Sequence, residues 1–223
     1  MSDVADFYER WARVYDLLAR HAPGVGSLRT RTVEALELSP GDDVLDVGCG
    51  TGATLPHLRE RVGPTGTVFG LDLTPGMLDR AGRLVARRDW SNVHLLRGDG
   101  ARPALAAGSV DAVVATFVVG MFEDPAAVVD RWIDLLAPGG RIALLNAVRS
   151  ERRAGAPINR ALDAVTVLST PPTRKLSYDD DVTGQLTERV EAATAAVERR
   201  SETARHERFL LGVVRLTAGR LPG

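Results

Sequence analysis

One short stretch, residues 44–52, constrains the fold of this chain more than any other. A mostly apolar run at residues 44–47 leads into closely spaced glycines at 48, 50 and 52, and a helical pattern opens directly afterwards. This order predicts a buried parallel strand, a tight turn and a helix N-terminus, the layout of nucleotide-binding α/β sheets. Glycine suits the turn because it adopts unusual φ/ψ angles and lets a ligand approach the backbone. Residues 48–53 also fit a loose G-x-G-x-x-G/A pattern, so a dinucleotide site is one interpretation.

Asp46 favours a different ligand. It stands at the end of the predicted strand, two residues before the first glycine, where it would face whatever lies over the loop. A carboxylate there repels a pyrophosphate but attracts a ligand that carries an ammonium and a sulfonium. S-adenosylmethionine is such a ligand, and the pattern D-x-G-x-G-x-G resembles the first motif of class I methyltransferases.

A second carboxylate, Asp72, ends the next predicted strand, residues 67–72. A carboxylate at this point can accept hydrogen bonds from both hydroxyls of an adenosine ribose. The alternative role, a cap for the following helix, is better suited to Thr74, because Pro75 then occupies the first helical position. Leu73 and Met77 follow Asp72, and Met77 either flanks an adenine or packs in the core.

Gly98-Asp99-Gly100 follows the third predicted strand, residues 92–97. Asp99 either accepts a hydrogen bond from an adenine amino group or belongs to a plain turn. The position at the carboxyl end of a strand favours the ligand. Asp111 starts the fourth strand, at the opposite edge of the sheet, and is expected to be structural.

The remaining pattern predicts an α/β chain that closes with an antiparallel pair of strands. Expected strands are 43–48, 67–72, 92–97, 109–117, 141–147, 195–204 and 207–217, and expected helices are 3–21, 27–38, 51–62, one opening at Pro75, 124–136, 158–168 and 182–193.

These motifs together resemble class I methyltransferases over residues 39–148. The resemblance implies a doubly wound, Rossmann-like sheet of seven strands in the order 3-2-1-4-5-7-6, with only strand 7 antiparallel. It implies one methyltransferase domain: an N-terminal helical cap (1–38), a cofactor-binding core (39–148), and an acceptor-side insertion with the closing strand pair (149–223).

The same resemblance implies S-adenosylmethionine as cofactor and assigns its contacts. The methionine part would lie on the loop, the ribose on Asp72, the adenine on Gly98-Asp99-Gly100, and the transferred methyl above Thr116 and Phe117. The expected cofactor-binding residues are Tyr15, Asp46, Gly48, Cys49, Gly50, Gly52, Asp72, Leu73, Met77, Gly98, Asp99, Gly100, Thr116 and Phe117.

The N-terminal helix, residues 3–21, carries an aromatic stripe that either forms a lid or packs on the domain. A glycine-rich break at residues 23–26 suits a hinge, and closing would bring Tyr15 over the sulfonium. The segment 11–16 resembles the branch of the family that methylates quinone precursors and phosphatidylethanolamine.

No side chain stands out as a general base, and methyl transfer to carbon or a neutral amine needs none. The weak candidates are His94, His206, Tyr8, Tyr178 and Glu123. No metal is expected, because residues 115–117 after the fourth strand lack the carboxylate of metal-assisted O-methyltransferases. The polar-Pro-Pro-aromatic turn of enzymes that methylate nucleic-acid amino groups is absent there too.

Composition restricts the partners. A net charge of −1 over 223 residues predicts no generic affinity for nucleic acid, and no apolar run is long enough for stable membrane insertion. With a single cysteine and no leader pattern, we expect a cytoplasmic protein, monomeric or homodimeric, that acts on a small or lipid-like acceptor. A dinucleotide-dependent oxidoreductase and a non-catalytic cofactor-binding module are the alternative functions.

Overall fold

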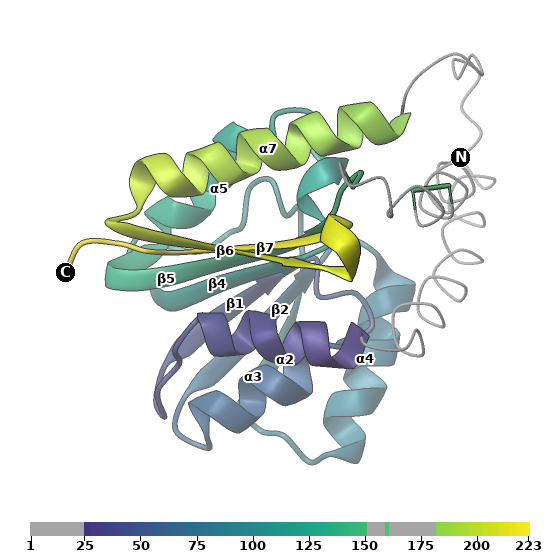
Figure 1. The fold of residues 1–223 in the computed structure, drawn as a ribbon. Helices are drawn as coiled ribbons and strands as arrows, with labels where there is room; N and C mark the ends of the chain where they lie inside the picture. The colour runs from purple at the N-terminus through teal and green to yellow at the C-terminus, as the bar shows by residue number, and fades with distance from the viewer. Residues whose placement is uncertain (1–24, 151–158, 161–181) are drawn as a thin grey trace.

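The computed structural model describes residues 25–150, 159–160 and 182–223 of the chain. A seven-stranded sheet in the order β3-β2-β1-β4-β5-β7-β6 forms its centre (Figure 1). The strands are β1 (Asp43–Val47), β2 (Thr67–Asp72), β3 (Val93–Arg97), β4 (Val110–Thr116), β5 (Leu136–Ala147), β6 (Thr203–Phe209) and β7 (Val214–Arg220).

Strand directions agree with the predicted topology. Strands β1 to β5 pair in parallel, whereas β7 is antiparallel to both β5 and β6. The carboxyl ends of β1 to β6 therefore all point to one edge of the sheet, called the carboxyl edge below. The predicted order and the antiparallel closing pair are confirmed.

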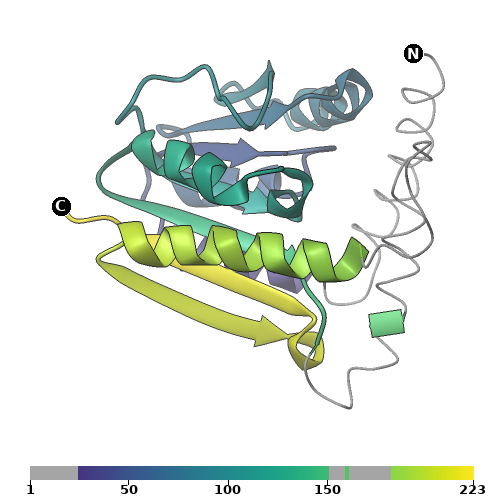
Figure 2. The same ribbon diagram turned by 90° about the horizontal axis from the view of Figure 1, so that it is seen from above.

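Helices cover both faces of the sheet (Figures 1 and 2). On one face lie α5 (Pro125–Asp134) and α7 (Val182–Arg200), and on the other lie α2 (Val25–Ala35), α3 (Leu55–Val62) and α4 (Pro75–Arg87). Two short 3-10 turns, η1 (Val119–Met121) and η3 (Leu210–Gly212), follow β4 and β6.

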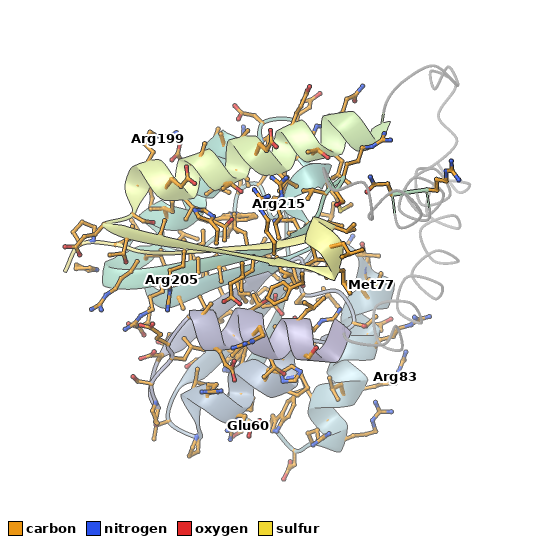
Figure 3. The ribbon with its side chains drawn as sticks, viewed as in Figure 1. Glu60, Met77, Arg83, Arg199, Arg205 and Arg215 are labelled. Atoms are coloured by element: carbon orange, nitrogen blue, oxygen red, sulfur yellow. The ribbon has the colours of Figure 1, made fainter. Side chains whose placement is uncertain are left out.

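The central strands are buried from both sides, which explains why their sequences are mostly apolar. In β1, Leu45 and Val47 belong to the same core cluster as Trp132 of α5, while Val44 belongs to the opposite cluster with Leu36, which directly follows α2. Charged side chains such as Glu60, Arg83 and Arg199 point away from the sheet (Figure 3).

Four predicted boundaries are wrong. The predicted strand 207–217 contains the end of β6, the turn η3 and the start of β7. The stretch 195–204 is mostly helix, because Val190, Ala193 and Val197 recur at helical spacing and are buried on α7. Strand β5 begins at Leu136 rather than residue 141, since Leu136 pairs with Val110 and the register shifts before Arg141. Helix α3 begins only at Leu55.

Asp111 has the structural role expected of it. Its Oδ2 accepts a hydrogen bond from the backbone N–H of Asp43 at 2.8 Å, at the edge opposite the carboxyl edge. The predicted helices at 3–21 and 158–168 lie outside the described residues, apart from the helical pair Asn159 and Arg160. Within the described ranges, no helix is long and apolar enough to cross a membrane.

Candidate cofactor site at the carboxyl edge

The loop after β1 turns on three glycines with left-handed backbone. Their φ angles are +68° at Gly48, +55° at Gly50 and +81° at Gly52, values that other residues adopt only with strain. The N–H groups of Gly48 and Cys49 both donate to the carbonyl of Leu71, at 2.8 and 3.0 Å. The loop is therefore fixed against the end of β2.

Asp72 connects this loop to the start of α4. Its Oδ2 accepts from the Gly50 N–H at 2.9 Å, and its Oδ1 accepts from the Thr74 N–H at 2.8 Å. Each carboxylate oxygen has two lone pairs, so both can accept a further hydrogen bond from a ligand hydroxyl. Thr74 occupies the N-cap position before Pro75, but its side chain makes no capping hydrogen bond. The prediction that Thr74 caps this helix is therefore wrong in that respect.

The Asp46 side chain is less accessible than its position in the sequence predicts. Its side chain is completely buried on the face covered by α2 and α3, and neither carboxylate oxygen has a hydrogen-bond partner among the described residues. Burial raises the pKa of Asp46 to about 8, against the opposing effect of Arg29 and with a smaller contribution from Asp72. Burial also raises the pKa of the neighbouring Cys49 thiol.

The turn at Gly98-Asp99-Gly100 is held from α5. The indole N–H of Trp132 donates to the Gly100 carbonyl at 2.7 Å, and Arg131 donates to the next carbonyl at 2.9 Å. A Cβ on Gly100 would lie 3.0 Å from a methyl of Val47 and 3.3 Å from Phe122. Asp99 is exposed and its Oδ1 accepts from the Ala101 N–H, which stabilises the turn and leaves Oδ2 accessible.

Phe117 has an unusual backbone conformation at this edge. It follows Thr116 at the end of β4 with φ +58°, while its N–H donates to the Leu145 carbonyl at 2.7 Å. A left-handed backbone conformation is strained for an aromatic residue, and strained residues of this kind are concentrated at functional sites. Val118, the next residue, packs against the first loop, where a Cβ on Gly48 would lie 2.8 Å from it.

A set of exposed apolar side chains shares the carboxyl edge. Leu73 follows β2, Met121 ends η1 after β4, and Leu210 and Leu211 connect β6 to β7, with exposures from 41% to 67%. These are the large hydrophobic side chains exposed in the described part of the chain. Sequence reasoning missed Leu210 and Leu211, whose φ angles are +49° and +58°; the pair beside Gly212 at a strand end was the available signal. We call these four residues the apolar rim.

The candidate general bases do not gather at the loop. His94 lies inside β3 with its ring beside Phe69, and His206 lies inside β6 between Thr217 and Glu198. Glu123 is exposed after η1. Tyr8, Tyr15 and Tyr178 lie outside the described residues, and with them the lid prediction. In the described ranges no group of three or more metal-ligating side chains occurs.

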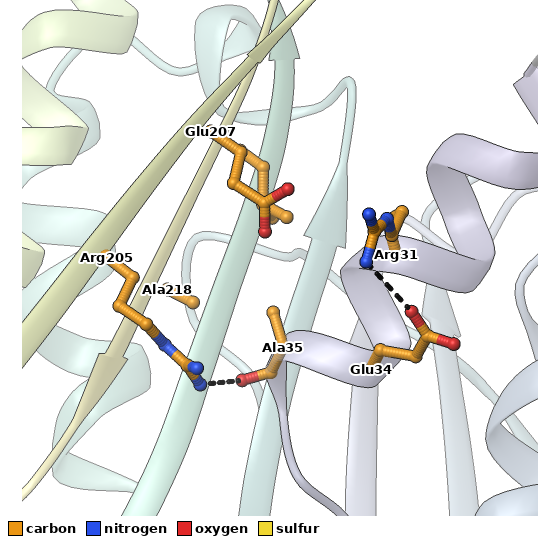
Figure 4. Close-up of a pocket in the computed structure, with 7 residues that line it drawn as sticks. Arg31, Glu34, Ala35, Arg205, Glu207 and Ala218 are labelled. Carbon is orange, nitrogen blue, oxygen red and sulfur yellow. Dashed lines mark hydrogen bonds and ion pairs between the residues drawn. The ribbon is translucent and has the colours of Figure 1, made fainter.

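A separate groove lies between α2 and the β6–β7 pair (Figure 4). Its lining residues are Arg31, Glu34, Ala35, Arg205, Glu207, Leu216 and Ala218. Both of its arginines form ion pairs: Arg31 contacts Glu34 at 3.7 Å and Arg205 contacts Glu37 at 2.6 Å. It contains none of the predicted site residues.

The fold and the carboxyl edge define a Rossmann-like methyltransferase architecture. A family profile described as a methyltransferase domain matches residues 44–140. In its sheet the chain is similar to a SAM-dependent methyltransferase from Aquifex aeolicus, with TM-score 0.60 at 19% identity, covering 96% of this chain and 98% of that one.

Two curated relatives agree with that profile. Nocamycin O-methyltransferase from Saccharothrix syringae is 42% identical over 144 residues, covering 63% of this chain and 50% of that protein. Aklanonic acid methyltransferase DauC from Streptomyces sp. (strain C5) is 37% identical over 118 residues, covering 53% of this chain and 54% of that protein. The chain thus spans about half the length of these relatives. Residues 44–140 thus match a methyltransferase domain, and the sheet order is that of the Rossmann-like fold of S-adenosylmethionine-dependent methyltransferases, whose cofactor is S-adenosylmethionine.

Proposed function

We propose that this protein transfers the methyl group of S-adenosylmethionine to a small apolar acceptor. The observation that carries the proposal is the arrangement at the carboxyl edge, where the left-handed glycine loop is hydrogen-bonded through Gly50 to Asp72. Open α/β sheets bind ligands in this position, outside the carboxyl ends of the strands.

The residues present fit this cofactor. The backbone of Gly48, Gly50 and Gly52 would hold its methionine part, Asp72 would accept from the ribose hydroxyls, and the turn at residues 98–100 would receive the adenine. Leu73 and Met77 stand on the adenine side, and Met77 lies on the first turn of α4 (Figure 3). The carboxyl of Asp46 lies buried below the loop without a hydrogen-bond partner among the described residues, and its ionised form would complement a cationic ligand.

The cofactor supplies an activated methyl on sulfur, so the protein has mainly to align the acceptor and exclude water. Thr116 and Phe117 would lie beside the methyl, and the left-handed backbone of Phe117 fixes that wall. The hydrogen bond from the Phe117 N–H to the Leu145 carbonyl of β5 would help to hold this wall in place. A general base is not required for every acceptor, and we assign none.

The apolar rim supports an apolar acceptor. Each of its residues is between 41% and 67% exposed at the carboxyl edge, and covering such apolar surface gains about 25 cal/mol per Å². The relatives' names are consistent with small-molecule acceptors, nocamycin and aklanonic acid. Serine substitutions at Met121 and Leu211 are expected to raise KM for apolar acceptors while S-adenosylhomocysteine affinity, the internal control, stays unchanged.

Calorimetry with S-adenosylhomocysteine and with NADH tests the cofactor. Heat with S-adenosylhomocysteine alone supports the proposal, and heat with NADH alone supports the dinucleotide-dependent oxidoreductase instead. Turnover with a panel of apolar acceptors then separates an enzyme from a cofactor-binding module. Persistent cofactor binding without methyl transfer to any acceptor would favour the module.

A further inference from the structure

Asp46 occupies an unusual place for a carboxyl group. It pairs with Gly70 of β2 and Val114 of β4 in the middle of the sheet, and its side chain is fully buried without a hydrogen-bond donor among the described residues. Its parity along β1 places it on the face of α2, where Arg29 is only 6% exposed. The cofactor loop begins two residues later, at Gly48.

A buried carboxylate without donors is unfavourable, so the neutral acid is the stable form in this environment. The pKa of about 8 places Asp46 as a protonated acid in the ligand-free protein at pH 7. The charged groups near Asp46 do not cancel the rise in its pKa. Arg29 opposes it, and Asp72 at the end of β2 adds to it. Burial and Arg29 lower the pKa of His57, and burial raises that of Cys49, so both stay neutral near pH 7.

We propose that Asp46 distinguishes the positively charged cofactor from its uncharged product by losing its proton when the cofactor binds and regaining one after methyl transfer. This proposal rests on the proposed function. S-adenosylmethionine carries a sulfonium, and S-adenosylhomocysteine carries a neutral thioether in its place. A cation beside the loop favours ionised Asp46, and by linkage ionised Asp46 favours the cation.

Charges balance through the cycle. Binding of the sulfonium expels one proton from Asp46 to solvent. Methyl transfer breaks the carbon–sulfur bond, its electron pair stays on sulfur, and the acceptor atom forms the new bond and gives up its own proton. Once the sulfonium charge has gone, Asp46 takes a proton back, and this weakens the hold on the product. The net release is the acceptor's proton alone.

The test compares the two ligands by calorimetry between pH 6 and pH 8, in buffers with different ionisation enthalpies. A pKa of about 8 limits the gain in S-adenosylmethionine affinity over this range to about fifty-fold, with close to one proton released at pH 7. S-adenosylhomocysteine is expected to gain much less. Because both ligands share the amino acid part, titration of that part affects both series.

Variants test whether the pH-dependent difference between the two ligands comes from Asp46. In Asp46→Asn the difference in affinity between the two ligands should no longer depend on pH. In Arg29→Met the pH dependence of that difference should shift to higher pH. Glu60→Gln, an exposed carboxylate on α3, is the matched control and should behave as the wild type. Melting curves show which variants remain folded.

The wild-type comparison decides the proposal even when a variant fails to fold. Equal pH dependence for the two ligands, or proton release that survives in folded Asp46→Asn, would overturn the proton-linked discrimination while leaving the methyltransferase function intact. Absence of binding by either ligand at any pH would instead overturn the proposed function.

Discussion

Replacing Asp72 by alanine separates two roles that this carboxylate combines. The side chain accepts hydrogen bonds from Gly50 and Thr74, at 2.9 and 2.8 Å, and it is the residue proposed to bind the ribose. The substitution therefore removes both the tie between the glycine loop and α4 and the acceptor for the ligand hydroxyls.

The magnitude follows from these bonds. A hydrogen bond to a charged group contributes about 1.5–3 kcal/mol, and Asp72 is half-buried, so water can replace part of the loss. We expect the free energy of unfolding without ligand to fall by about 2–4 kcal/mol. At about 2–4 °C per kcal/mol for a chain of this size, Tm falls by roughly 4–16 °C. Loss of even one ribose hydrogen bond weakens cofactor affinity about tenfold or more.

The assay pairs thermal unfolding of the ligand-free protein with calorimetric titration of S-adenosylhomocysteine. Asp79→Ala is the control, since Asp79 is an exposed carboxylate on α4, the helix that follows Asp72, and it should leave both quantities unchanged. A folded Asp72→Ala variant with lower Tm and wild-type affinity would refute the ribose role. Unchanged Tm would refute the structural role of the two backbone hydrogen bonds.

Three further predictions test the geometry of the site. Gly48→Ala should destabilise the protein by more than Gly108→Ala in thermal unfolding, because both have positive φ but only a Cβ at 48 meets a side chain, at 2.8 Å. Trp132→Phe leaves the Gly100 carbonyl without its donor, so it should lower stability by about 1–3 kcal/mol and weaken cofactor affinity, and equal affinity in calorimetry would show that this turn does not touch the ligand. Since folding raises the pKa of Asp46 from 3.8 to about 8, its stabilising contribution is complete below pH 3.8 and is lost as pH rises through 8. Denaturant unfolding should show this loss, approaching about 1.4 kcal/mol per pH unit between pH 5 and 7, and Asp46→Asn should remove it.

Local pattern was sufficient for the parallel part of the fold. The apolar strand and spaced glycines at residues 44–52, with Asp72 and the turn at 98–100, predicted the strand–loop–helix units, while the order of the sheet was implied by the family resemblance that these motifs carry. These features are readable because each depends on nearby residues: a positive φ needs glycine, and a strand buried on both faces needs a continuous apolar run.

Helix α7 and strand β5 show where local pattern fails. The sequence at the end of α7 predicts a strand, but in the structure this segment is helical and α7 packs against α5. The sequence at the start of β5 predicts the end of a helix, but in the structure Leu136 pairs with Val110 of β4. In both cases a partner distant in sequence decides the conformation. Tertiary contacts override local preference because burial against a partner contributes more than propensity.

The sequence by itself determined which residues reach the carboxyl edge: the glycine loop, Asp72, and the turn at residues 98–100. Only the tertiary structure decided how they act. It placed Asp46 beneath the loop in full burial, where its oxygens have no donor among the described residues, and it brought Leu210 and Leu211 to the same edge from the far end of the chain. The physical reason is that spacing along the chain fixes the identity and order of side chains, whereas solvation and charge environment depend on which other segments cover them.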